Sequence, residues 1–314
     1  MTQKQIFELA IKLGMENDLR GELAVKKYLA RQKKLFNELP PKKRAEFDKE
    51  KLINPYMDSG IWVDDGKSVK KILVGIDAGA GEILLAKELG IDTVMGHHPI
   101  GKSLAMLDEV MHMQADILAL YGVPINIAES LLKERISEVA RGLHPINHYR
   151  TIDAAKLLKV NLMNIHTPAD NLVASFLKKE VERKKPEYVD EILEIIKNIE
   201  EYKKAAQLGV PTKLFAGSGD NRVGKIAFVE LTGGTEGAKN IYRTLATAGV
   251  GTVIAMHLSE EHRKNVEAAH INLVVAPHIA SDSLGLNLFL DEIEKKGIEI
   301  IPCSGLIRIK RFKR

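Results

Sequence analysis

Short apolar runs that alternate with amphipathic helical segments are the feature that most constrains the fold of this chain. A run such as KILVGID at 71–77 is almost continuously apolar, as expected for a strand buried on both faces of a parallel sheet. Similar runs recur at 92–96, 124–128, 161–165, 225–231, 252–255, 272–275 and 298–302. Segments with apolar residues at helical spacing separate most of these runs. This alternation predicts an α/β fold made of two α/β domains with mainly parallel sheets.

The length and the local composition of the chain predict four parts. With 314 residues, the chain is long enough for about two domains. We expect a helical N-terminal extension at 1–66, a first α/β domain at 67–170, a helical connector at 171–209 and a second α/β domain at 210–314. Within these parts, helix is expected over 3–51, and the stretch 52–70 that follows is typical of an irregular connector.

The distribution of charge gives little support for nucleic-acid binding. The chain holds 46 Lys and Arg residues against 42 Asp and Glu, and residues 1–51 hold 13 of the basic residues against 8 of the acidic ones. Tyr28 and Phe36 fall on the apolar face of the expected helix, so no aromatic ring lies among the charges to stack on bases. We therefore favour a solvated helix face, with nucleic-acid binding through residues 20–51 and the basic tail at 308–314 as the weaker alternative.

No membrane or secretory segment is expected in this sequence. It contains no run of about 18 apolar residues, and its N-terminus lacks the apolar block of a signal peptide. Cys303 is the single cysteine, so an intrachain disulfide and a site built from several thiolates are both excluded. These observations predict a cytoplasmic protein in which histidine and carboxylate side chains are the available metal ligands.

Five of the ten histidines stand just past the end of an expected strand. These residues are His97, His98, His166, His257 and His278. In open α/β sheets, ligands bind at the carboxyl ends of the strands, so this position is functionally meaningful. Each histidine taken singly could equally well be a structural residue that caps backbone carbonyls. Their repeated placement favours metal binding.

Two carboxylates accompany these histidines at helical spacing. Asp170 lies four residues after His166, and Asp282 lies four residues after His278, so each pair can approach one point from one side of a helical turn. Imidazole and carboxylate together suit Zn, Fe, Mn or Co better than Ca or Mg. Two ions about 3.5–4 Å apart would use all of these ligands. Counting ligands leaves open whether the site holds one ion or two.

Three motifs in this sequence resemble those of the Nif-three-like family of dinuclear metal proteins. The segment DAGAGEILLAKELGIDTVMGHHP at 77–99 is similar to its strand, helix, strand and HHP signature, and HTPAD at 166–170 is similar to its His-Thr-x-x-Asp signature. The segment INLVVAPHIASD at 271–282 resembles its C-terminal signature, in which a strand leads to a histidine and, four residues later, to a glutamate. The order and the spacing agree over roughly residues 70–314.

The resemblance implies a set of ligands and an assembly. It assigns two divalent metal ions to His97, His98, Asp170, His278 and Asp282, in a site between the two domains of a homohexameric ring. Asp282 stands where the family has a glutamate, and the N-terminal extension is outside the usual pattern. His257 stands where many members have Gly-Asp, so it is expected either to bind a metal or to orient a ligand.

The chemistry expected of such a site is hydrolysis. A divalent ion polarises carbonyl or phosphoryl oxygens and lowers the pKa of bound water, and by resemblance the reaction could be that of a type-two GTP cyclohydrolase. Candidates for a base or proton carrier are Asp77, Glu129 and His166. The sequence thus predicts a metal-dependent hydrolase of a small nucleotide-like or phosphorylated substrate. A non-enzymatic metal-binding oligomeric scaffold or regulatory protein is the alternative.

Glycine-rich segments offer places where a substrate anion could bind. They lie at 78–82, 216–224 and 232–237, and none of them has the Gly-Lys-Ser/Thr of a P-loop. A glycine-rich turn is more often a tight connection than a phosphate site. For a nucleotide substrate, 216–220 and 232–237 are the segments where we would look first.

Overall fold

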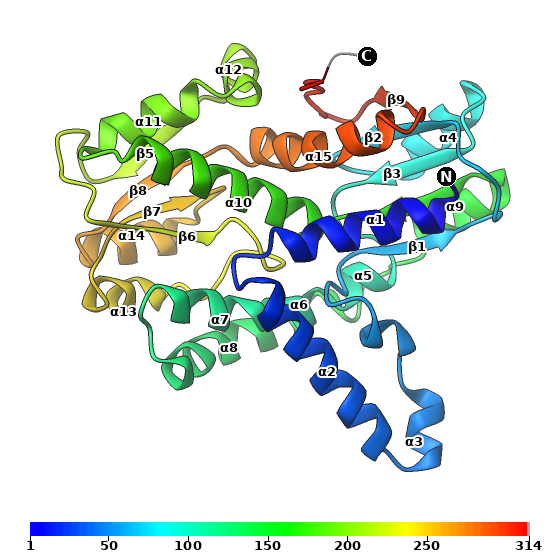
Figure 1. Cartoon of the computed structure of the whole chain (residues 1–314), viewed down its shortest axis with the longest axis horizontal. Helices are drawn as coiled ribbons and strands as arrows, with labels where there is room; N and C mark the ends of the chain where they lie inside the picture. The colour runs from blue at the N-terminus through cyan, green and yellow to red at the C-terminus, as the bar shows by residue number, and fades with distance from the viewer. Residues whose placement is uncertain (313–314) are drawn as a thin grey trace.

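Two sheets at opposite ends of the molecule form the frame of the structure, a computed structural model that describes residues 1–312 (Figure 1). The first sheet has the order β1-β4-β3-β2-β9, with β1 (Gly60–Val63), β2 (Lys71–Gly75), β3 (Thr93–Gly96), β4 (Asn161–Asn164) and β9 (Glu299–Pro302). The second has the order β5-β8-β7-β6, with β5 (Lys213–Ala216), β6 (Lys225–Glu230), β7 (Val250–Ala255) and β8 (Asn272–Val275). In each sheet one edge strand, β1 or β5, is antiparallel and the other strands are parallel. The predicted α/β class with two mainly parallel sheets is confirmed.

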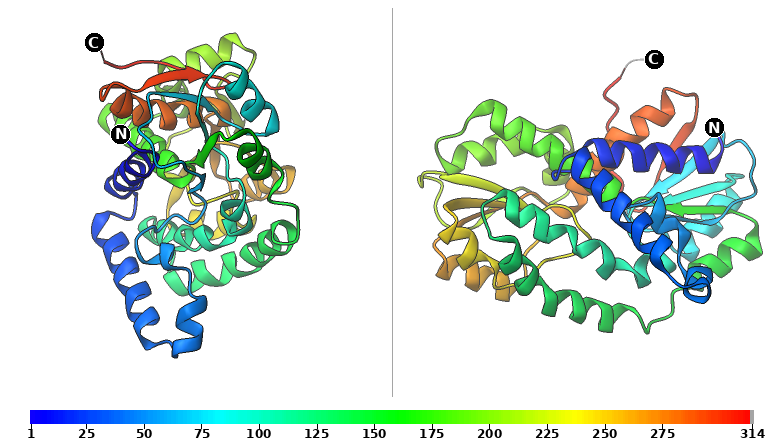
Figure 2. Two further views of the ribbon diagram at one scale, coloured as in Figure 1. Left: turned by 90° about the vertical axis from the view of Figure 1, so that its right-hand side faces the viewer. Right: turned by 60° about the horizontal axis from the view of Figure 1, so that its bottom comes forward.

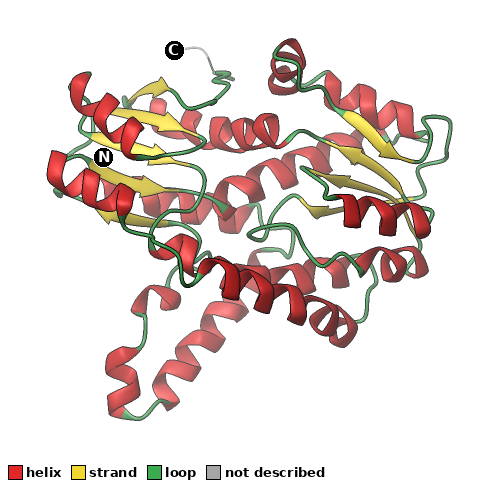
Figure 3. Ribbon diagram, turned by 180° about the vertical axis from the view of Figure 1, so that it is seen from behind, coloured by secondary structure: helices red, strands yellow, loops and turns green. Residues whose placement is uncertain are grey.

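Helices cover both sheets and connect them (Figure 3). The N-terminal helices are α1 (Gln3–Glu16), α2 (Glu22–Glu38), α3 (Pro41–Glu46) and the 3-10 turn η1 (Lys49–Leu52). Those of the first half are α4 (Ala80–Glu88), α5 (Lys102–Ala105), α6 (Leu107–Met111), α7 (Met113–Leu120), α8 (Ile125–Leu143) and α9 (Arg150–Leu158). The remaining helices are α10 (Thr167–Lys184), α11 (Val189–Lys197), α12 (Glu200–Gln207), α13 (Ile241–Thr247), α14 (Glu260–Ala268) and α15 (His278–Glu294).

Several elements differ from those expected from the sequence. The stretch 52–70 contains β1, which pairs with β4, and the expected strand at 124–128 is the first turn of α8. Pro124 precedes that turn, and Ile125 and Ile127 are about 40% exposed, so the apolar run does not enter a sheet. The strand β9 pairs with β2 of the first sheet, although the sequence placed it with the second domain. A short apolar run carries no information about its strand partner.

The long helices α10 and α15 pack against each other through the middle of the molecule. Both helices contribute buried residues to the core of the first sheet, including Leu172 and Phe289, and to the core of the second, including Leu177 and Leu284. At their crossing, a Cβ atom on Gly285 would lie 2.3 Å from the carbonyl oxygen of Ala169. Only glycine therefore allows the two backbones to approach this closely.

Replacing Gly285 with alanine is expected to destabilise the protein by about 1–3 kcal/mol, because the added methyl group must push α15 away from α10. Gly142, in the last turn of α8, is the matched control, since its Cβ would meet nothing within 4 Å. Gly142→Ala is expected to raise stability by up to about 1 kcal/mol through helix propensity. Thermal unfolding of both variants measures the difference, and equal midpoints would contradict the close helix crossing.

The N-terminal extension divides into a packed part and a projecting part. Helix α1 packs on α10 and β1, whereas α2 and α3 extend away from the body (Figures 1 and 2). Val25 is the only buried residue of α2. No helix within residues 1–312 combines the length and the apolar character that crossing a membrane requires.

The basic residues of the C-terminal tail that are described are mostly paired with acidic residues. Arg308 Nη2 lies 2.6 Å from Asp291 Oδ1 and 2.7 Å from Glu294 Oε2, and Arg311 makes two 2.6 Å contacts with Glu201. These pairs fasten the tail to α15 and α12. Lys313 and Arg314 lie outside the described residues.

Candidate metal centre

Four histidines converge near the ends of the strands β3, β4 and β8. His97 and His98 follow β3, His166 precedes α10 at the end of β4, and His278 is the first residue of α15 after β8. Their rings are neighbours, with centroids 4.9 Å apart for His97 and His166 and 5.3 Å apart for His98 and His278. Because β8 belongs to the second sheet, this cluster draws on both halves of the molecule.

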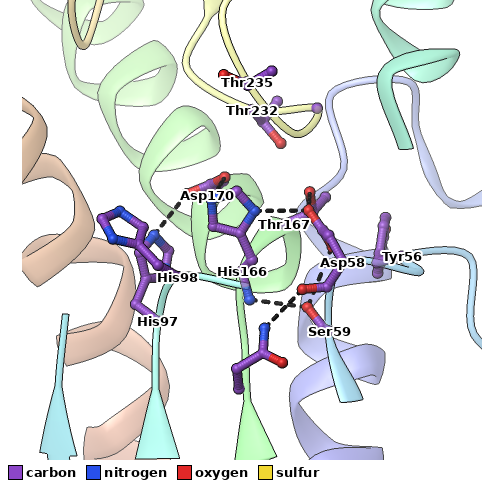
Figure 4. A network of polar contacts seen from close by, with 12 residues as sticks. Tyr56, Asp58, Ser59, His97, His98, His166, Thr167, Asp170, Thr232 and Thr235 are labelled. Carbon is purple, nitrogen blue, oxygen red and sulfur yellow. Dashed lines mark hydrogen bonds and ion pairs between the residues drawn. The ribbon is translucent and has the colours of Figure 1, made fainter. Parts of the chain in front are cut away.

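Two aspartates stand among these rings. Asp282 Oδ1 lies 3.5 Å from His97 Nε2 and 3.4 Å from His278 Nε2, while its Oδ2 lies 3.4 Å from His98 Nε2. Asp170 Oδ1 lies 3.4 Å from His97 Nε2, and its Oδ2 lies 3.8 Å from His166 Nε2 (Figure 4). The structure thus brings together all five residues that the resemblance assigns as ligands, and it adds His166 to them.

The tautomers of the rings leave lone pairs directed at the carboxylates. His97 Nδ1 lies 2.9 Å from the carbonyl oxygen of Ile165, and a carbonyl can only accept, so this nitrogen carries the proton. In the neutral ring, Nε2 therefore presents a lone pair to the oxygens of Asp170 and Asp282. The Nε2 lone pair and the carboxylate oxygens are all hydrogen-bond acceptors, so their close approach requires a positive charge between them.

The unpaired atoms fit a metal ion. Within residues 1–312, the Nε2 atoms of His97 and His98 and Oδ1 of Asp282 are buried and have no hydrogen-bond partner. Two groups, His97–His98–Asp282 and His97–His166–Asp170, place one ligand atom of each member within 4.8 Å of the others. Buried His and Asp side chains at these spacings could hold a metal ion.

The electrostatics of the cluster agree with this reading. Burial disfavours the charged form of His97, yet the carboxylates of Asp282 and Asp170 raise its pKa well above the ordinary value. Burial would raise the pKa of Asp282, but the surrounding histidines lower it far below the usual range. Burial lowers the pKa of His278 to about 4, so this ring is neutral at pH 7. The carboxylates therefore attract positive charge, which a proton or a metal ion can supply.

Carboxylates behind the rings fix two further histidines. Asp77, which is exposed, lies 2.8 Å from Nδ1 of His98, and Asp58, which is fully buried, lies 2.8 Å from Nδ1 of His166. Such contacts orient an imidazole so that its other nitrogen faces the metal. Asp77 and His166, two of the predicted base candidates, are thus already engaged in holding the cluster together.

Asp58 is a residue of the site that the sequence analysis missed. Its Oδ2 also accepts a 2.6 Å hydrogen bond from the hydroxyl of Thr167, and its backbone carbonyl accepts one of 2.7 Å from Asn164 (Figure 4). The neighbouring Ser59 hydroxyl accepts a 2.9 Å hydrogen bond from the backbone N–H of His166. Asp58 lies in the segment expected to be irregular, about 20 residues before the nearest motif, which begins at residue 77, so no spacing pattern indicated it.

A cavity of about 240 Å³ lies beside the cluster, lined on one side by His98, His166, Asp170 and His278. The other side is formed by Glu230 at the end of β6, by residues of the loop 231–236, and by Met256 and His257. Nε2 of Gln114 donates to the carbonyl oxygens of Gly233 and Thr235, both at 2.7 Å, and so holds this loop in place. Of the three glycine-rich segments, 232–237 is the one that borders this cavity.

His257 lies at the edge of the cluster. Its ring centroid is 5.1 Å from that of His278, and its Nδ1 lies 3.8 Å from Oε1 of Glu236. That contact with Glu236 raises the pKa of His257 above its ordinary value, against the opposing effect of burial. His257 belongs to neither of the two groups of possible ligands, which were sought among residues 1–312.

Glu129, the third predicted base candidate, is not brought to the site. It is exposed on α8, which packs against α6 and α7. The expectation placed it at the end of a strand at 124–128, and that strand is a helix. Glu129 is therefore not among the residues that line the cavity.

Comparison with known proteins agrees with this arrangement. The structure of a NIF3 superfamily protein from Sphaerobacter thermophilus matches with a TM-score of 0.77 and 25% sequence identity, and the match covers 98% of this chain and 99% of that one. Reduced HcgD from Methanocaldococcus jannaschii matches with a TM-score of 0.52 and 17% identity over 78% of this chain and 88% of its own, a likeness of fold alone. No protein-family model and no curated protein matches the sequence.

The match to the Sphaerobacter protein includes the N-terminal extension, since it leaves only 2% of this chain uncovered. The extension is therefore shared with a known structure and is not peculiar to this sequence. The resemblance that the three motifs predicted is confirmed over almost the whole length: this chain is similar to a NIF3 superfamily protein and has the fold of that superfamily.

Proposed function

We propose that this protein binds two divalent metal ions in the cleft between its sheets and hydrolyses a small phosphorylated or nucleotide-like molecule there. The observation that carries the proposal is that, among residues 1–312, the buried Nε2 atoms of His97 and His98 have no hydrogen-bond partner and lie 3.4–3.5 Å from the carboxylate of Asp282, which comes from the other half of the chain. Burying such atoms without partners is costly, so a bound cation accounts for their placement.

The ligands divide into two sets. His98 and His278 with Asp282 would hold one ion, and His97 and His166 with Asp170 would hold the other. A mixture of imidazole and carboxylate accepts zinc, iron, manganese or cobalt. Ions bound there would polarise a carbonyl or phosphoryl oxygen of the substrate and make water acidic enough to attack near neutral pH.

The protein itself supplies orientation and a binding cavity. Asp58, Asp77 and the carbonyl of Ile165 hold three of the rings with their Nε2 atoms toward the carboxylates. The loop 231–236, which Gln114 holds in place, also lines the cavity. A substrate in the cavity would be enclosed by this loop and the metal ligands. GTP is one candidate substrate, suggested by the resemblance to type-two GTP cyclohydrolases.

The proposal is tested on the purified full-length chain by metal analysis and a substrate panel. We expect about two ions per chain, loss of turnover on chelation, and recovery when a divalent ion is returned. The panel contains GTP, p-nitrophenyl phosphate, phenyl phosphate and a phosphodiester, with His97→Ala as the variant that removes a ligand. Less than one ion per chain, unchanged in His97→Ala, would contradict metal binding.

Stoichiometric metal without metal-dependent turnover of any panel member would instead favour the second candidate, a metal-binding scaffold or regulatory protein. The homohexamer implied by the family resemblance is a separate proposal. Light scattering of the eluting peak in size-exclusion chromatography measures it directly.

A further inference from the structure

A buried carboxyl group lines the cavity beside the proposed metal centre and is not among its possible ligands. Glu230 ends β6 and is 8% exposed, and it lines the same cavity as His98, His166 and His278. Neither group of possible metal ligands among residues 1–312 includes it. A small molecule that fills this cavity would therefore be close to both the proposed ligands and Glu230.

One oxygen of Glu230 is fixed and the other is available. The backbone N–H of Gly237 donates to Oε2 at 3.1 Å, which anchors the carboxyl to the loop that follows β6. Among the described residues, no donor pairs with Oε1. The loop is in turn held by the amide of Gln114, and a Cβ on Gly237 would lie 2.9 Å from that side chain, so the anchor has little freedom to move.

The charged groups around Glu230 leave it able to exchange a proton near neutral pH. Burial raises its pKa to about 7, against the Gly237 hydrogen bond and the opposing charges of His257 and Arg135, while Glu236 adds to the increase. The Tyr242 hydroxyl, whose own pKa burial raises far above its usual value, faces the same group and stays neutral. An acid with a pKa near the working pH is the most effective proton donor.

The other candidates for this role are accounted for. Nδ1 of His166 is bonded to Asp58, and its Nε2 faces Asp170, while Asp77 is bonded to His98. Glu129 lies outside the cavity lining. Of the three proton carriers expected from the sequence, none combines access to the cavity with freedom from the metal ligands.

We propose that Glu230 is the proton donor of this site, a role that rests on the proposed hydrolysis. As the oxygen of water bonds to the phosphorus atom, the bond from phosphorus to the leaving oxygen breaks. The proton of the Glu230 carboxyl passes to that leaving oxygen, and the carboxylate then regains a proton from the attacking water. The balance is one ester and one water consumed, and one alcohol and one phosphate formed.

Two esters with different leaving groups test the assignment. Phenolate from phenyl phosphate needs a proton as it departs, whereas p-nitrophenolate leaves without one. Glu230→Gln is therefore expected to slow phenyl phosphate about 10²–10⁴-fold and p-nitrophenyl phosphate less than tenfold. The wild-type rate on phenyl phosphate is expected to fall as the pH rises through about 7, and the variant should lack this fall.

A spectroscopic readout separates the two proposals. Infrared difference spectra of the purified protein between pH 5 and 9 should show a protonated carboxyl band that titrates near pH 7 and is missing in Glu230→Gln. Glu88→Gln, at an exposed glutamate of α4, is the matched control and should change neither the band nor the rates.

A wild type that turns over nothing overturns the hydrolase and the donor role together. An active wild type whose Glu230→Gln variant slows both esters equally, or whose spectrum keeps the band, overturns the donor role alone.

Discussion

Replacing Asp282 with alanine is expected to weaken metal binding by more than about 100-fold and to abolish metal-dependent turnover. Its two oxygens are shared among His97, His98 and His278, so no other side chain of the cluster contacts so many of the proposed ligands. Removing even a residue that only orients a ligand costs 10–100-fold in metal affinity, and the loss of a direct ligand should exceed this. Metal analysis after dialysis and calorimetric titration with Zn²⁺ or Mn²⁺ measure the effect.

Asp153→Ala is the matched control, because Asp153 is an exposed aspartate on α9 and has no contact with the cluster. Circular dichroism in the presence of a chelator establishes whether both variants fold. A folded Asp282→Ala protein that keeps two ions with wild-type affinity would show that Asp282 is not a ligand.

Replacing Asp58 with alanine is expected to cost both stability and metal affinity. The change leaves the buried Nδ1–H of His166 and the hydroxyl of Thr167 without their acceptor, at about 1–3 kcal/mol for each donor. It also frees the His166 ring to rotate, so we expect metal affinity to fall about 10–100-fold. Thermal unfolding with a chelator and metal titration without one measure the two effects separately.

Two variants sharpen this test. Asp58→Asn keeps the volume and one acceptor oxygen, so its stability loss should be smaller while a defect in metal affinity remains. Asp64→Ala, in the exposed loop that follows β1, should change neither quantity. Equal metal affinity in the wild type and Asp58→Ala would show that the orientation of His166 does not matter for binding.

The cluster of histidines and aspartates could be predicted from the sequence because of a general property of the fold. Strand ends are recognisable as the end of an apolar run, and parallel strands bring those ends to one edge of a sheet. His97, His98 and His166 satisfy this rule within one sheet, and His278 satisfies it within the other. The i, i+4 spacing placed Asp170 and Asp282 beside them, as the distances to His166 and His278 bear out.

Asp58 and Glu230 could not be predicted, for two different reasons. Asp58 reaches the cluster through the pairing of β1 with β4, a contact between residues about 100 positions apart. Glu230 ends an otherwise apolar strand, and its importance comes from burial and from the cavity beside it. Glu129 was wrongly expected at the site because the first turn of α8 was predicted to be a strand.

The order of elements in space has a consequence for how the protein is made. Helix α7 belongs to the segment between β3 and β4, yet it packs against β6, and its Ile117 and Leu118 share a core with Val253 and Val274 of the second sheet. The first sheet in turn receives its last strand, β9, from residues 299–302. The first sheet therefore cannot be completed until the last strand of the chain has been made. A chain divided between residues 209 and 210 would give two fragments, each with an apolar surface that the other fragment covers in the whole chain.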